Sequence, residues 1–95
     1  MNKYEELAAR VGKLVDEKNA AYGNSFAKVS DFLKILYPDG IKPEQYTDVL
    51  CIVRIFDKLM RIATKKGAFN ESPWTDIAGY ALLGLQKDEE NMNDK

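Results

Sequence analysis

The stretch PEQYTDVLCIVRIFDKLMRIATKK, residues 43–66, is the longest patterned segment of the sequence. Wound as a helix, it places apolar side chains around most of its circumference, so we expect a central helix with neighbours on several sides. Pro43 suits the first helical position, and Gly67 suits a C-terminal stop. The β-branched residues between Val49 and Ile55 would also suit a strand. The length of the segment and the three-and-four-residue spacing of its polar residues favour a helix.

Two helices are predicted before this segment. The first covers about residues 2–19, where apolar residues recur every three or four positions. The pair at 23–24, a glycine and an asparagine, predicts a turn. Ser25 is the expected N-cap of the second helix, and the Pro-Asp-Gly sequence at 38–40 predicts the turn that closes it.

The fourth predicted helix has the clearest start. Ser72 is the expected N-cap and Pro73 the first helical residue, and the apolar pattern continues to about Lys87. The polar residues 88–95 are expected to form a disordered tail. The sequence therefore predicts one domain over residues 1–87, all-α and four-helix bundle-like.

Composition excludes several classes of chemistry. The 95 residues carry a net charge of -1, which disfavours nucleic-acid binding, and they include no histidine. Without imidazole, a zinc site or a histidine-based triad is not expected, and any metal site must use carboxylates, which favours Mg²⁺ or Mn²⁺. The lone Cys51 and the absence of a signal peptide or long apolar run predict a cytoplasmic protein without a membrane span.

A charged stripe interrupts the third predicted helix. Arg54, Asp57, Lys58 and Arg61 stand at positions i, i+3, i+4 and i+7 and share one face. This face could be an ordinary solvated surface with internal ion pairs. It could also be a polyphosphate site, with guanidinium and ammonium groups for phosphate oxygens and a carboxylate for a divalent ion.

A second polar cluster surrounds the start of the fourth predicted helix. Glu71 and Asp76 could simply stabilise the positive end of the helix dipole. Gly79 needs a reason, because glycine inside a helix costs about 1 kcal/mol relative to alanine. Close helix packing is the first explanation. Room for a flat ligand is the alternative, and Tyr80 shares that face.

The end of the first predicted helix holds a third cluster. Asn19 and Tyr22 lie beside Glu17 and the 23–24 turn. They could belong to an ordinary surface loop. They could equally hold a nucleoside, through stacking on the tyrosine ring and hydrogen bonds to the amide.

Together these clusters resemble a known family. The segments EKNAAYG (17–23), VRIFDKLMR (53–61), ES (71–72) and DIAGYA (76–81) resemble a phage and prophage family called nucleotide-modification-associated, or MazG-like. The resemblance covers about residues 10–86. It implies kinship with the all-α nucleoside triphosphate pyrophosphatases, which assemble as dimers or tetramers and use magnesium bound by acidic residues on two helices.

The carboxylate pattern departs from that of those enzymes. They carry Glu-x-x-Glu and Glu-x-x-Asp, whereas this chain has Arg54-x-x-Asp57 and Asp76-x-x-Gly79. Half of the four-carboxylate set is therefore missing. On the resemblance, Asp57 and Asp76 would be the catalytic, magnesium-binding residues, and Glu17 or Glu71 could supply a further ligand.

The function expected from these observations is nucleotide binding, with Mg²⁺-dependent pyrophosphohydrolysis of a nucleoside triphosphate. Phosphates would be held by Arg54, Lys58 and Arg61, and the nucleoside by Asn19, Tyr22 and Tyr80. The alternative is a non-catalytic nucleotide-sensing or partner-binding helical module. A homo-oligomer, dimer or tetramer, is expected in either case, because one short chain offers few helices to cover the apolar third helix.

Overall fold

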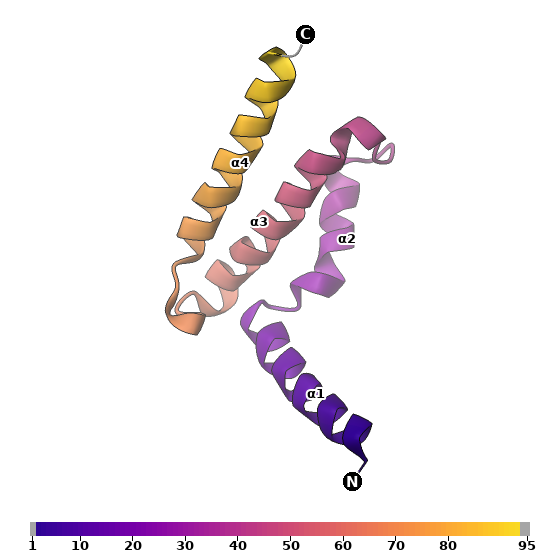
Figure 1. Cartoon of the computed structure of the whole chain (residues 1–95), viewed down its shortest axis with the longest axis vertical. Coiled ribbons are helices and arrows are strands. Elements are labelled where there is room, and N and C mark those ends of the chain that lie inside the picture. Colours follow the sequence, from indigo (N-terminus) through magenta and orange to yellow (C-terminus); the bar gives the residue numbers. More distant parts are fainter. Residues whose placement is uncertain (1, 94–95) are drawn as a thin grey trace.

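A computed structural model describes residues 2–93, and over these residues the chain is all-α. Its helices are α1 (Lys3–Ala21), α2 (Ser25–Leu36), α3 (Tyr46–Lys65) and α4 (Pro73–Asn93). Short 3-10 turns, η1 (Pro43–Gln45) and η2 (Ala68–Asn70), precede α3 and α4. No strand occurs within residues 2–93. The predicted all-α, bundle-like fold is confirmed (Figure 1).

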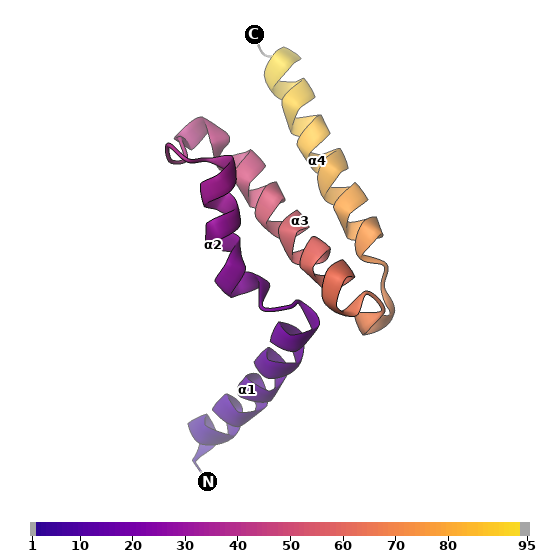
Figure 2. The same ribbon diagram turned by 180° about the vertical axis from the view of Figure 1, so that it is seen from behind.

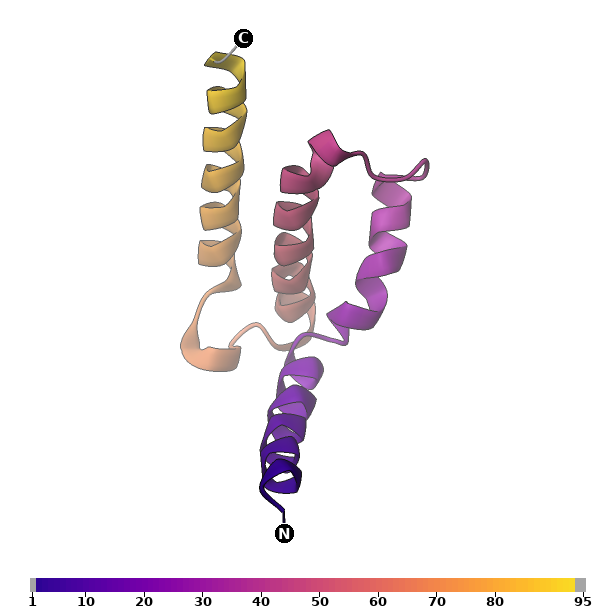
Figure 3. The same cartoon turned by 45° about the vertical axis from the view of Figure 1, so that its right-hand side comes forward.

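The third helix is central, as its sequence predicts. α2, α3 and α4 stand side by side with α3 in the middle (Figure 3), and α1 also contacts α3. Phe56 of α3 stacks on Phe32 of α2, with ring centroids 4.6 Å apart. Most apolar residues of α3 are nevertheless only half-buried. The helix is therefore surrounded but not enclosed.

The first helix leaves the bundle. α1 points away from the other three helices (Figures 1 and 2), and the molecule measures 59 × 28 × 26 Å. Gly23 and Asn24 both have positive φ, 61° and 60°, and together they form a sharp elbow between α1 and α2. The predicted turn at these two residues is confirmed. It sends α1 outward rather than back along the bundle.

Helix starts differ from the prediction at two places. Asn24, in the left-handed region, is the N-cap of α2, and Ser25 is its first helical residue, so the expected role of Ser25 as N-cap is wrong. The Ser25 hydroxyl instead donates a hydrogen bond to Asp57. Pro43 begins η1, and α3 starts only at Tyr46.

Helix ends also differ. α1 runs two residues beyond the predicted end, to Ala21, and α4 runs past Lys87 to Asn93. Residues 88–93 of the predicted tail are thus helical, while 94–95 lie outside the described residues. Straight-chain residues favour this extension, and Lys87 pairs with Glu90 one turn on, at 3.9 Å. None of the described helices combines the length and apolarity needed to cross a bilayer.

Candidate functional site

An open groove of about 680 Å³ lies where the end of α1 meets the other three helices. Its volume falls in the range of small-molecule sites. Six of the residues singled out from the sequence line it: Asn19, Tyr22, Arg54, Asp57, Lys58 and Tyr80. Most of the remaining lining is apolar and comes from Leu14, Val15, Phe26, Val29, Leu50 and Val53. The groove therefore combines charged groups, two tyrosines and an apolar floor.

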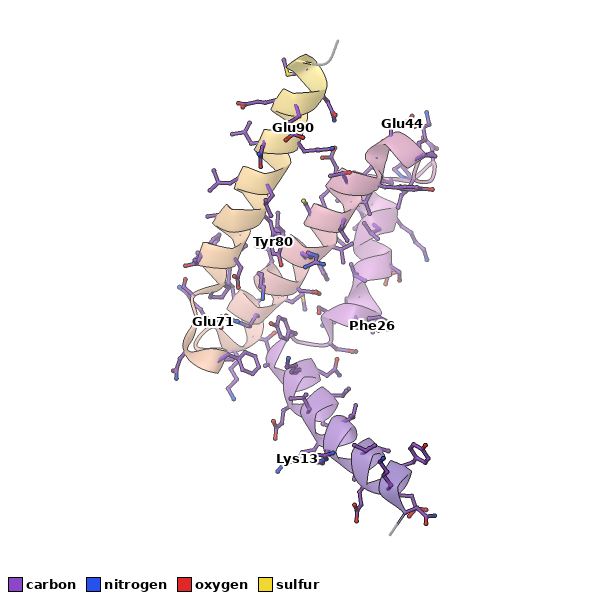
Figure 4. The ribbon with its side chains drawn as sticks, viewed as in Figure 1. Lys13, Phe26, Glu44, Glu71, Tyr80 and Glu90 are labelled. Atoms are coloured by element: carbon purple, nitrogen blue, oxygen red, sulfur yellow. The ribbon has the colours of Figure 1, made fainter. Side chains whose placement is uncertain are left out.

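Arg54 and Tyr80 form one edge of the groove. Arg54 NH1 donates a hydrogen bond to the Tyr80 hydroxyl at 3.3 Å, and the guanidinium lies 5.7 Å from the ring centroid. In Figure 4, Tyr80 lies on the side of α4 that faces α3. Hydrogen bonding and charge interaction with Tyr80 raise the pKa of Arg54 above its ordinary value. The guanidinium is exposed and has donors to spare.

Lys58 connects three helices at the centre of the site. Its ammonium donates a hydrogen bond to the Tyr22 hydroxyl at 3.3 Å and lies 3.3 Å from a carboxylate oxygen of Asp76. Burial lowers the pKa of Lys58, but the hydrogen bonds to Tyr22 and Asp76 outweigh it, so the pKa lies above its ordinary value. The same ammonium lies 5.5 Å from the Tyr22 ring centroid. One cation thus joins the end of α1 to the start of α4.

Asp57 is oriented by the elbow. The Ser25 hydroxyl donates to Asp57 Oδ1 at 2.8 Å, and Ser25 itself is buried. This bond fixes one carboxylate oxygen of Asp57 at the start of α2. The other oxygen has no hydrogen-bond partner among the described residues. Asp57 is therefore held in place within the groove and keeps acceptor capacity.

Arg61 lies apart from the groove although it shares the stripe with Arg54 and Lys58. Its side chain is 1% exposed, and NH2 donates to the backbone carbonyl of Glu71. The guanidinium also lies 5.8 Å from the centroid of the Phe69 ring. Arg61 therefore ties η2 to α3, and it does not face the groove where a ligand would lie.

The four carboxylates proposed as metal ligands do not meet. Glu17 is exposed on α1, and Glu71 is exposed in the segment before α4 (Figure 4); neither lines the groove. Asp76 contacts Lys58, whereas Asp57 accepts a hydrogen bond from Ser25. Within residues 2–93, no three acidic or cysteine side chains are grouped as a metal site. Over the described part of the chain there is therefore no four-carboxylate cage.

Two site features were not predicted. Ser25 was assigned to a helix cap, so its bond to Asp57 was missed; a serine one residue after an elbow was the available signal. Phe69 stacks near Tyr22, with centroids 6.2 Å apart, and nothing in its sequence context indicated that. The close helix packing expected at Gly79 is wrong. A Cβ there would meet no atom within 4 Å, so the position is open and borders a shallow depression on α4.

Comparisons of the chain with models of protein families, with curated proteins and with solved structures find no match.

Proposed function

We propose that the chain binds a nucleoside phosphate in the groove. The observation that carries this proposal is the convergence of three distant segments on one cavity. Tyr22 comes from the end of α1, Arg54 and Lys58 from α3, and Tyr80 from α4. Cations and aromatic rings around an apolar floor suit a ligand that has a flat base at one end and negative charge at the other.

The phosphates would contact Arg54 and Lys58. Arg54 is exposed, and its planar guanidinium can donate two parallel bonds to a phosphate while the Tyr80 contact gives way or is shared. Lys58 supplies a point charge already stabilised in its protonated form. Arg61 is excluded from direct contact because it is buried against η2. Two cations rather than three therefore serve this role.

The nucleoside would occupy the apolar part of the groove. Tyr22 and Tyr80 offer ring faces for stacking, and the Asn19 amide offers both a donor and an acceptor for the edge of a base or a ribose hydroxyl. Leu50 and Val53 form the apolar floor beneath them. Such a site holds a base mainly by shape and stacking, with few groups to select one base over another.

Mg²⁺ or Mn²⁺ would bind together with the nucleotide, mainly through the phosphates of the ligand. Magnesium in proteins is commonly held by one or two carboxylates together with substrate phosphates, so a pair of carboxylates is sufficient. Asp57 lines the groove, and Asp76 contacts a lysine that lines it. Asp57 would contact such an ion directly, and Asp76 would do so only after releasing Lys58, whereas Glu17 and Glu71 lie outside the groove.

Binding without turnover is the form that the geometry supports best. Lys58 already neutralises Asp76 at 3.3 Å, so a cation of the protein occupies a position where a metal-dependent hydrolase would need a free carboxylate. A pyrophosphohydrolase is the second candidate, favoured by the free oxygen of Asp57 inside the groove. Either activity is proposed for the cytoplasm, where the free Cys51 would stay reduced.

Isothermal titration with nucleoside mono- and triphosphates, with and without Mg²⁺, tests the proposal. We expect Arg54→Ala to weaken binding by about ten- to 150-fold, since a charge-assisted bond contributes about 1.5–3 kcal/mol. Lys34→Ala is the matched control, because this exposed lysine of α2 does not line the groove. Absence of binding by any nucleotide would overturn the proposal. Pyrophosphate release in the same samples would select the hydrolytic candidate.

A further inference from the structure

The apolar face of α1 has no partner within the chain. It consists of Tyr4, Leu7, Val11, Leu14 and Val15, all of them exposed, Tyr4 by 80% and Val11 by 58%. Their spacing of three and four residues produces a continuous stripe along the helix, the pattern of a helix that packs against another. α1 touches the bundle only at its end, where Ala21 is buried and Tyr22 meets Lys58. The stripe itself extends away from the bundle (Figure 2).

The chain exposes more surface than a compact monomer of the same size. A compact chain of 95 residues has a radius of gyration of about 12 Å, whereas this one has 16.8 Å. Its accessible surface is 7452 Å². A folded monomer of 10.8 kDa exposes about 5,500 Å². The excess of about 1,900 Å² matches what one subunit buries in an obligate homodimer.

The small apolar interior also indicates that the chain packs against another surface. Among the described residues, the buried apolar side chains besides Pro73 are Ala21 and Ala68, both small. A larger apolar interior would further stabilise a chain of this size that has no disulfides. A second copy of the chain would supply it, because the copy presents the same apolar face in the same amount.

We infer that the apolar face of α1 is the surface on which a second copy of this chain packs, with the two α1 helices antiparallel. This arrangement pairs four of the five apolar residues in one register, with Tyr4 opposite Leu14 of the partner subunit and Leu7 opposite Val11 of the partner subunit. α1 is favoured over the exposed apolar residues of α4 because α4 already packs along α3, whereas α1 has no such neighbour.

The inferred interface also reaches the groove. Leu14 and Val15 belong both to the apolar face of α1 and to the wall of the groove. A second copy seated on that face would cover the open side of the groove beside Asn19. Self-association through α1 does not depend on nucleotide binding, so each can fail without the other.

The experiment measures the mass of the full chain in solution, without nucleotide, by light scattering after size exclusion. We expect the wild-type chain to have at least twice its 10.8 kDa mass, and Val11→Glu to be monomeric at the same concentration. Leu82→Glu is the matched control, since Leu82 is an equally exposed leucine on α4. It should leave the mass unchanged, and circular dichroism would verify that both variants are helical.

A tetramer that Val11→Glu dissociates supports the same surface. A monomeric wild-type chain at tens of micromolar would overturn the inference. So would a dimer that Leu82→Glu dissociates and Val11→Glu does not. A monomeric chain that binds anionic lipid vesicles through Val11 would also overturn it, by assigning the face to a membrane surface. If Val11→Glu loses its helical signal, a cysteine at Val11 in a Cys51→Ser chain, cross-linked across the interface by a bifunctional maleimide, gives the same decision.

Discussion

The charged face of α3 and the apolar face of α1 differ in how many contacts their side chains make with the rest of the chain. On α3, Arg54, Lys58 and Arg61 each contact a group from another element, respectively Tyr80, Asp76 and the Glu71 carbonyl. On α1, the apolar face from Tyr4 to Val15 stays exposed to solvent. The usual order is partly reversed, because these polar side chains have partners within the chain whereas the apolar side chains of α1 are exposed. Polarity alone therefore did not decide which faces this chain covers by itself.

The elbow at Gly23 explains the contrast. A Cβ added at Gly23 would lie 2.3 Å from Thr64 Oγ1, so the elbow is pressed against the end of α3. From that contact α1 leads away from the other three helices (Figure 1). The chain thereby gives up intramolecular cover for α1 and keeps its apolar face free.

The contrast is tested most strongly by truncating one residue on each side. Phe56→Ala should lower the free energy of unfolding by about 3 kcal/mol, because it removes a ring stacked on Phe32. Val11→Ala, measured at a concentration where the chain is monomeric, should change it by less than about 0.5 kcal/mol. Urea unfolding followed by circular dichroism compares the two. Equal losses would mean that α1 is packed as well as α3.

The elbow provides the next effect. Gly23→Ala should lower stability by about 2 kcal/mol, since alanine at φ 61° is strained and its Cβ collides with Thr64. Thr64→Ala in the same chain removes the colliding oxygen and should recover part of the loss. If Gly23→Ala is as stable as the wild-type chain by thermal unfolding, the elbow does not fix the direction of α1.

A substitution of Arg61 tests whether this residue of α3 stabilises the fold or binds phosphate. Arg61→Met keeps an apolar stem and loses the hydrogen bond to Glu71, so we expect a loss of about 1–2 kcal/mol. Nucleotide affinity should be the same within error, because Arg61 does not line the groove. Arg10→Met, on the exposed surface of α1, is the control for loss of charge. A large loss of affinity without loss of stability would return Arg61 to the phosphate-binding set.

The smallest effect expected is on pH dependence. The folded pKa of Lys58 is raised, so the stability that its contacts contribute is complete below the unfolded pKa, near 10.5, and is lost as pH rises through the folded value. The difference in melting temperature between the wild-type chain and Lys58→Met should therefore shrink between pH 10 and pH 12. A difference that stays constant over this interval would show that the ammonium charge contributes nothing.

The sequence predicted the fold well and the site in part. Helix periodicity and turn residues located all four helices and the central place of α3, because these depend on local spacing. The groove residues Tyr22, Arg54 and Tyr80 were also predicted. The buried place of Arg61 was not, since it depends on the path of η2, in which Phe69 and Asn70 adopt positive φ. Ser25 was missed for a similar reason, because its partner Asp57 is 32 residues away.

Phe69 links the two connecting segments that meet at the end of α3. Its ring stacks against Tyr22 on one side and against the Arg61 guanidinium on the other. The α1–α2 elbow and the α3–α4 connection therefore share one aromatic contact at the same end of α3. The groove residue Tyr22 therefore lies next to the segment that leads into α4.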